Sequence, residues 1–221
     1  MMKTPKDLLK KKEELLKETT FKRFVPEIDY STFESLIHGF AEAIMRKRSN
    51  FNEYIVDSEN QKHIRYMYDY LLGESASDGL KIIPSRGVFL SGNVGAGKTL
   101  LLTAYCNIWN ELFHNHKVPY ILVKHSSDLA NDIIKEGVDP FKKRPLFIDD
   151  LGKEVVTAKN YGTVVKPLTE LLNLRYDTGA WTFATTNIPL PDLSALYGAH
   201  TFDRMREMFN FISMTNKTRR K

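Results

Sequence analysis

The sequence of 221 residues predicts an α/β fold, in which a parallel five-stranded sheet carries helices on both faces and follows a small helical N-terminal region. Two observations predict it. From residue 87 onward, short β-rich apolar runs alternate with longer helical patterns, which is typical of a parallel sheet covered on both sides. A glycine-rich loop also joins the first of these runs to a helix, as in phosphate-binding folds. We expect strands at 87–91, 118–124, 145–149, 181–186 and 210–214, and helices near 98–113, 127–136, 160–177 and 191–209.

The first 80 residues have helical patterns of their own. Pro5 suits the first turn of a helix, and residues 31–34 and 58–61 each have the pattern of a capping box ahead of apolar residues at helical spacing. Gly73 is a helix stop, and turn-forming residues follow it. We therefore expect a helical region at 1–80, which would bind a partner protein, and an α/β domain at 81–221. Whether the apolar helix faces pack within the chain or against a partner stays open.

Composition and charge exclude several classes of protein. An apolar content of 42% allows a real core, whereas no run is long enough to span a membrane and no secretory signal is evident. The single cysteine, Cys106, excludes an internal disulfide and a cysteine-rich zinc site. The formal charge of +5 is concentrated in residues 217–221, which form either a solvated tail or a contact to a phosphate backbone. We expect a cytoplasmic protein that does not contact membranes.

Residues 92–99 match the phosphate-loop pattern G-x-x-x-x-G-K-[ST]. The glycines allow the backbone to direct its N–H groups at phosphate oxygens. Lys98 is expected to reach the β- and γ-phosphates, and the Thr99 hydroxyl to bind Mg²⁺. The residues expected to contact the nucleotide are Gly92, Asn93, Val94, Gly95, Ala96, Gly97, Lys98, Thr99 and Leu100.

Polar residues end two later strands. Asp149 and Asp150 close the strand at 145–149, and a phosphoryl-transfer site needs an acid near Mg²⁺ and a group that orients the attacking water. We assign Asp149 to the metal and Asp150 to the water; the alternative is an Asp pair that caps a turn. The strand at 181–186 would place Asn187 or Thr186 near the γ-phosphate, unless Asn187 only forms a turn.

The order of these motifs resembles that of the AAA+ ATPases, in particular the DnaC-type helicase loaders and the related IstB transposition ATPases. The resemblance covers residues 85–221 and rests on the phosphate loop, on the segments 148–154, 161–162 and 171–176, on Thr182 to Asn187, and on 197–208. The shorter layout of the helicase-loader group, without a C-terminal lid domain, also fits where this sequence ends. That leaves Arg219 or Arg220 as a phosphate or DNA contact.

In this family an arginine of one subunit reaches the γ-phosphate of its neighbour, within a pattern Gly-x-Arg-x-x-Asp-Arg. Gly198, Asp203 and Arg204 match the pattern, but His200 stands at its first arginine position. The resemblance therefore favours Arg204 as the arginine in trans, with Arg206 and Arg175 as alternatives. Arg204 could instead pair within the chain, with Asp203 or Glu207.

The resemblance implies an ATPase that uses ATP and Mg²⁺, assembles head to tail as a spiral or filament on single-stranded DNA, and delivers a replicative helicase held by its N-terminal helices. Two alternatives stay open. The first is a transposition accessory ATPase that binds duplex DNA and a transposase. The second is a P-loop small-molecule kinase or nucleotide-gated scaffold, although the sequence shows no acceptor pocket or arginine-bearing lid.

Overall fold

A computed structural model describes residues 5–18, 25–47, 54, 56–77, 79–114, 118–154, 158–160 and 163–215. Five strands, β3 (Gly87–Gly92), β4 (Leu122–His125), β5 (Leu146–Asp149), β8 (Thr182–Thr186) and β9 (Phe209–Met214), form one sheet in the order β4-β5-β8-β3-β9. Every neighbouring pair is parallel. The expected parallel five-stranded sheet is confirmed, and β8 lies directly beside β3.

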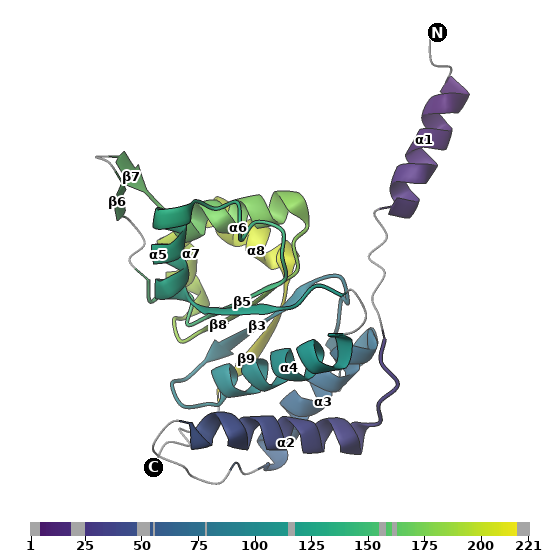
Figure 1. Ribbon diagram of the computed structural model, residues 1–221, viewed down its shortest axis with the longest axis vertical. Helices are drawn as coiled ribbons and strands as arrows, with labels where there is room; N and C mark the ends of the chain where they lie inside the picture. The colour runs from purple at the N-terminus through teal and green to yellow at the C-terminus, as the bar shows by residue number, and fades with distance from the viewer. Residues whose placement is uncertain are drawn as a thin grey trace.

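Helices cover both faces of this sheet, as Figure 1 shows. On one face lie α2 (Tyr30–Arg46), α3 (Ser58–Leu72) and α4 (Lys98–Phe113); on the other lie α5 (Ser126–Glu136), α6 (Pro167–Thr178), α7 (Leu190–Tyr197) and α8 (Ala199–Met208). Each face has its own buried hydrophobic cluster. The order β3, phosphate loop, α4 is the strand, loop and helix that the motif requires.

The apolar faces of α2 and α3 pack within the chain, which answers a question that the sequence left open. Phe33 and Ile37 of α2 and Ile64 and Tyr70 of α3 are fully buried in the same cluster as residues of α4 and β8. Tyr70 also joins α3 to the sheet, since its hydroxyl donates to Arg86 O (2.7 Å) and accepts from Trp181 Nε1 (2.7 Å). These two helices thus share a core with the sheet.

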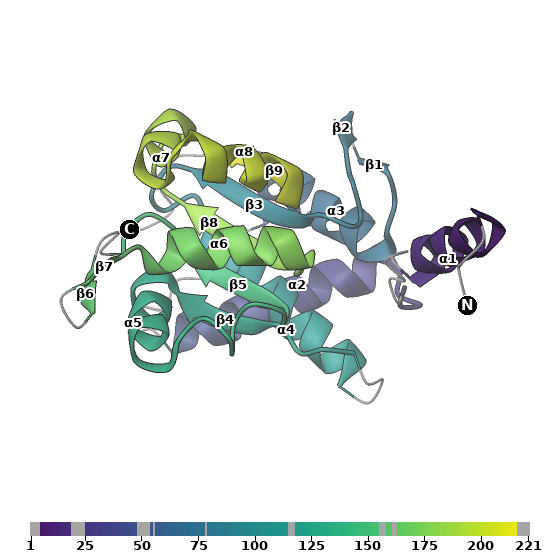
Figure 2. The same cartoon turned by 90° about the horizontal axis from the view of Figure 1, so that it is seen from above.

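The helix α1 (Pro5–Glu18) and two small hairpins lie outside this core. In Figures 1 and 2, α1 stands apart from the rest of the molecule. One hairpin, β1 (Ala76–Ser77) with β2 (Leu80–Lys81), follows α3, and the other, β6 (Ala158–Asn160) with β7 (Thr163–Val165), projects beside α5. Among the described helices, none has both the length and the apolar character needed to cross a membrane.

Two expected helices have different bounds. The helix expected at 160–177 begins only at Pro167, because the β-branched residues 163–165 form β7 and a proline favours the first turn of a helix. The helix expected at 191–209 is two helices, since Gly198 breaks it with φ 87° and ψ 147°. That backbone conformation is open to glycine but not to an ordinary residue.

The second strand is shorter than the expected 118–124. It begins at Leu122, because the side chain of Asn110 on α4 forms hydrogen bonds with both main-chain groups of the preceding residue, Ile121. Asn110 Nδ2 donates to Ile121 O (3.1 Å), and Ile121 N donates to Asn110 Oδ1 (2.8 Å). With both groups satisfied by a helix, Ile121 does not pair with the sheet.

The predicted capping boxes of α2 and α3 are displaced. Asp29, rather than Ser31, caps α2 by accepting from Thr32 N (2.9 Å), and Asp57 caps α3 by accepting from Asn60 N (2.9 Å). Asp57 directly precedes the serine that the pattern indicated, and Asp29 lies two residues before it. Carboxylates suit this position at least as well as hydroxyls. Gly73 ends α3 in the left-handed conformation, at φ 74°, as expected.

Candidate nucleotide site

The phosphate loop contains glycines for two different physical reasons. Gly95 and Gly97 have φ values of 84° and 94°, a region that favours glycine, and Gly97 precedes the first residue of α4. Gly92 has φ 142°, and a Cβ there would lie 2.0 Å from Met214 O on β9. Gly95 and Gly97 therefore shape the loop, whereas Gly92 lets β3 and β9 approach each other.

Lys98 lies at the base of this loop with its side chain buried, 4% exposed. Its ammonium donates to Gly92 O (2.8 Å), to Asn93 O (2.7 Å) and to Asn187 Oδ1 (2.6 Å). The loop from β3 and the end of β8 thus meet at one cation, as expected if Asn187 follows a strand that neighbours β3.

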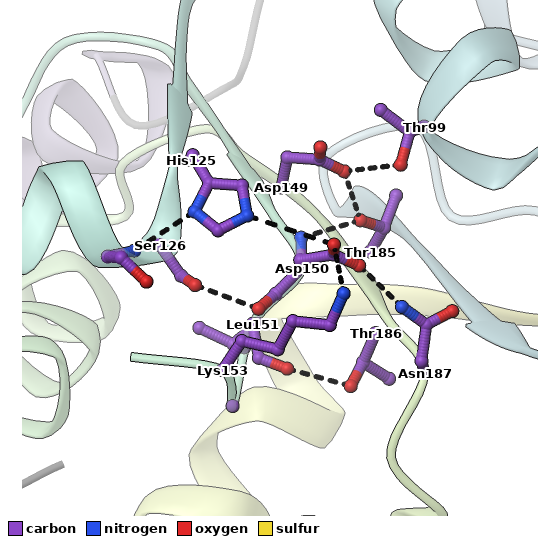
Figure 3. Close-up of polar contacts among 12 residues, drawn as sticks. Thr99, His125, Ser126, Asp149, Asp150, Leu151, Lys153, Thr185, Thr186 and Asn187 are labelled. Atoms are coloured by element: carbon purple, nitrogen blue, oxygen red, sulfur yellow. Dashed lines mark hydrogen bonds and ion pairs between the residues drawn. The ribbon is translucent and has the colours of Figure 1, made fainter. Parts of the chain in front are cut away.

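The hydroxyl of Thr99 and the carboxylate of Asp149 are in contact. Asp149 Oδ1 accepts from Thr99 Oγ1 (2.7 Å) and from Thr185 Oγ1 (2.6 Å), as Figure 3 shows. Mg²⁺ prefers such oxygen ligands and is commonly held by one or two protein groups together with phosphates. Within the described parts of the chain, no three His, Cys, Asp or Glu side chains gather to hold a metal by themselves. As two oxygen ligands in contact, Thr99 and Asp149 fit Mg²⁺ that also has phosphate ligands.

Asp150 has the one positive φ among the described non-glycine residues, 55°. Its Oδ1 accepts from Asn187 Nδ2 (2.6 Å) and its Oδ2 from Lys153 Nζ (2.6 Å), and His125 Nε2 lies 3.8 Å from Oδ2 (Figure 3). The main chain of Asp150 does form a turn, since Lys153 N donates to Asp150 O (3.1 Å). Its carboxylate, however, faces Asn187 and Lys153, so it is presented to the site.

Asn187 and Thr186 were both candidates for the position near the phosphate, and the structure separates them. Asn187 links Lys98 to Asp150 through the two ends of its amide. Thr186 is fully buried, and its hydroxyl donates to Leu151 O (2.8 Å) and accepts from Ile188 N (3.1 Å). The Thr186 alternative is therefore wrong, because its side chain holds the turn after β5.

The sequence reasoning missed Thr185, Ser126 and Lys153. Thr185 Oγ1 donates to Asp149 and accepts from Asp150 N (2.9 Å), and Ser126 Oγ donates to Asp150 O (2.8 Å). A signal existed for Thr185, since residues two apart in a strand share a face and Asn187 follows it by two. Ser126 and Lys153 gave no comparable signal, because their contacts depend on how β4 and the turn lie beside β5.

Arg175 is not available to a neighbouring subunit. It is fully buried, and its guanidinium donates to Thr182 Oγ1 (2.9 Å), Trp181 O (2.7 Å), Arg144 O (3.0 Å) and Phe141 O. These acceptors lie before β5 and at the start of β8, that is, at the amino ends of the strands, whereas the site lies at their carboxyl ends. Burial lowers the pKa of the Arg175 guanidinium to about 9. Its proposed role in trans is therefore wrong.

Arg204 is tethered within the chain, but not to the expected partners. Its guanidinium lies 3.1 Å from Asn173 Oδ1, 3.4 Å from Asp177 Oδ1 and 4.9 Å from the ring centre of Tyr176, all on α6. Glu207, expected as a partner, instead accepts from Tyr176 OH (2.7 Å). The side chain is 27% exposed, so part of it faces outward. Arg219 and Arg220 lie outside the described residues.

The comparison of sequences gives similarity to a replication initiator. No protein-family model matches the chain. A segment of 114 residues is 29% identical to the chromosomal replication initiator protein DnaA of Borreliella burgdorferi, which is 51% of this chain and only 22% of that protein.

The comparisons with solved structures give broader similarity. The structure of DnaI covers 76% of this chain and 88% of its own, with 25% identity and a TM-score of 0.53. The similarity to a DnaC helicase loader covers 73% of this chain and 93% of the loader, with 20% identity and a TM-score of 0.54. The similarity to AMPPCP-bound DnaA from Aquifex aeolicus covers 75% of this chain and 50% of DnaA, with 19% identity and a TM-score of 0.50. The chain thus has a P-loop fold of the AAA+ type, and its structure is similar to those of DnaI and a DnaC helicase loader.

Proposed function

We propose that the chain binds ATP together with Mg²⁺ at the carboxyl ends of its parallel strands, and that it hydrolyses the ATP. One observation carries this proposal. Lys98, Asn187 and Asp150 form a continuous chain of hydrogen bonds beside the Thr99 and Asp149 pair. These are the groups that phosphoryl transfer requires: a cation and a metal site for the phosphates, and a carboxylate and an amide for the water.

Each residue has a physical task in this proposal. The loop N–H groups, the N-terminus of α4 and Lys98 hold the β- and γ-phosphates. Thr99 and Asp149 would hold Mg²⁺, which neutralises phosphate charge. Asp150 and Asn187 orient a water molecule for attack on the γ-phosphate, because a carboxylate accepts its hydrogen and an amide fixes its position.

The similarity to DnaI and to a DnaC helicase loader supports a role in DNA replication, in which the chain delivers a replicative helicase. One of the similar structures is the replication initiator DnaA bound to AMPPCP and single-stranded DNA. We infer that this chain also assembles on single-stranded DNA, as an ATP-dependent oligomer in which Arg204 reaches the neighbouring subunit. The exposed helix α1 is our candidate for the contact to the helicase.

The ATPase proposal is tested by hydrolysis and by binding of a fluorescent ATP analogue. Lys98→Ala should abolish turnover, because no other described cation lies within the loop. Lys143→Ala, at an exposed lysine of the loop before β5, is the matched control and should behave as the unsubstituted chain. Turnover that survives in Lys98→Ala, with magnesium present, would refute the site.

The role of Arg204 needs a separate measurement. Arg204→Ala should leave the affinity for the ATP analogue unchanged but lower turnover at high protein concentration, by about 10³-fold or more if the arginine acts as in other NTPases. Arg46→Ala, at an exposed arginine of α2, is the control. Arg206→Ala tests the alternative arginine in the same assay. Turnover of Arg204→Ala equal to that of the unsubstituted chain would remove Arg204 from the role in trans.

The replication role is tested by capture of partners with the tagged full chain in the presence of ATP, read by mass spectrometry. A replicative helicase, retained with ATP and reduced for Lys98→Ala, is the expected result. A transposase in its place would instead support the transposition accessory ATPase. Mass measurement with and without ATP and single-stranded DNA tests the oligomer.

A further inference from the structure

The turn after β5 is held rigidly on several elements, although Lys153 on it has an exposed side chain. Leu151 is fully buried and its N–H donates to Thr185 O (2.7 Å). Gly152, at φ 98°, packs closely, since a Cβ there would lie 2.5 Å from Ile188 Cδ1, just before α7, and 3.2 Å from Leu193 Cδ1 on α7. The backbone from Asp150 to Lys153 therefore has little freedom.

The end of the turn is anchored by a buried carboxylate. Glu154 is 6% exposed, accepts from Gly152 N (2.9 Å) and receives a hydrogen bond from the hydroxyl of Tyr197 on α7. Burial raises the pKa of the Tyr197 hydroxyl, which therefore remains a neutral donor. Because Leu151 and Glu154 are held on either side of it, the backbone of Lys153 is also held in place. The position from which its side chain extends is therefore fixed.

Lys153 supplies the second of two donors that hold the Asp150 carboxylate. The Asp150 carboxylate has an amide N–H on Oδ1 and an ammonium on Oδ2, each at 2.6 Å, so its plane is held by two donors on opposite oxygens (Figure 3). Each oxygen has two lone pairs, so a water molecule can still donate to it. Asp150 itself is 17% exposed, compared with 49% for Lys153.

We propose that Lys153 is a positioning residue that orients the Asp150 carboxylate for the attacking water. An isolated surface ion pair contributes little to stability, since side-chain entropy and solvent offset the attraction. Here the rigid turn has already fixed the lysine backbone, and the carboxylate has a second restraint in Asn187. A carboxylate that is held in the correct plane needs no reorientation during the reaction. This inference rests on the ATPase activity proposed above.

The test compares Lys153→Met and Lys153→Arg with Lys142→Met. Lys142 is the matched control, because its ammonium lies 2.5 Å from Asp139 Oδ1 at the same spacing of three residues, away from the site. Lys153→Met should lower kcat by about 5- to 30-fold, in keeping with modest misplacement of a reacting group, and should leave the affinity for the fluorescent ATP analogue within about twofold. Lys153→Arg should recover most of kcat, and Lys142→Met should change neither quantity.

A double-mutant cycle shows whether Lys153 affects kcat through Asp150. If Lys153 acts through Asp150, adding Lys153→Met to Asp150→Asn should cause no further loss of kcat. An unchanged or increased kcat in Lys153→Met, or an equal further loss in the Asp150→Asn background, would overturn the inference while the ATPase proposal stands. If the unsubstituted chain bound the analogue but did not hydrolyse ATP, both proposals would fail.

Discussion

Replacement of Arg175 by methionine should destabilise the protein strongly while leaving the chemistry of the site intact. The guanidinium supplies donors to four protein oxygens, three of them main-chain carbonyls, and it is fully buried. Methionine fills much of the same volume but has no donor. The four acceptors would lose their partner in a place that water does not reach, at a cost of about 1 kcal/mol each.

The expected loss in the free energy of unfolding is thus about 3–4 kcal/mol, which for a chain of this size lowers Tm by roughly 6–16 °C. Circular dichroism during heating measures it, and urea titration should show a lower midpoint with an unchanged m-value. Arg144→Met is the matched control: it is an exposed arginine on the loop whose carbonyl Arg175 binds. Its effect should be within about 0.5 kcal/mol.

Two outcomes would refute this reasoning about Arg175. A Tm change below about 2 °C would mean that the buried bonds contribute nothing net. A fall in ATP turnover of 10³-fold with an unchanged Tm would be the behaviour of an arginine that acts in trans. The structure predicts the reverse pattern: a lower Tm, with turnover by the folded variant at low temperature close to that of the unsubstituted chain.

Three further predictions concern the frame around the site. Tyr70→Phe should cost about 1–3 kcal/mol of stability, because it removes the hydroxyl that Trp181 Nε1 and the linker before β3 both use; thermal melting checks it. Gly92→Ala should reduce stability as well as nucleotide binding, since its Cβ would meet the main chain of β9; melting without nucleotide separates the two effects. The Thr32 N–H, with side-chain hydrogen bonds, holds the pKa of Asp29 at about 2, below 3.8, so this cap contributes stability above pH 4 that is lost as the pH falls through 2. The Tm difference between the unsubstituted chain and Asp29→Ala should therefore narrow over that range.

The sequence predicts the strands of the sheet well, because a buried parallel strand needs a run of apolar β-forming residues and little else. The sequence predicts the first and last residues of a helix or strand less well where a side chain from another element determines where it begins or ends. The start of β4 depends on Asn110, which lies on another element and bonds to Ile121 through the fold. Arg175 continues the spacing of Leu168, Leu171 and Leu172 on the buried face of α6, but an arginine is almost never fully buried unless its charge has partners. Carbonyls of two other segments make its burial possible.

The same distinction separates the site residues. Lys98 and Thr99 belong to a continuous motif whose backbone shape follows from its glycines, so the sequence predicts their positions. Asp149 and Asn187 follow from the rule that parallel strands present their carboxyl ends at one edge. Ser126 completes the arrangement through a contact between α5 and the turn after β5, and Lys153 through the folded shape of that turn; no sequence pattern contains either contact.

The order and register of the strands explain how Asp150 is kept in a backbone conformation that costs a non-glycine residue about 1 kcal/mol or more. His125 of β4 lies opposite Asp149 of β5, so the next residues, Ser126 and Asp150, are also neighbours and share a hydrogen bond. On the other side β8 supplies Thr185, which binds Asp150 N. The residue that follows β4 and a residue of β8 thus hold the main chain of Asp150 from both sides. The strained main chain that presents the carboxylate therefore depends on the whole sheet, and a shift in the pairing of β4 or β8 with β5 would release it.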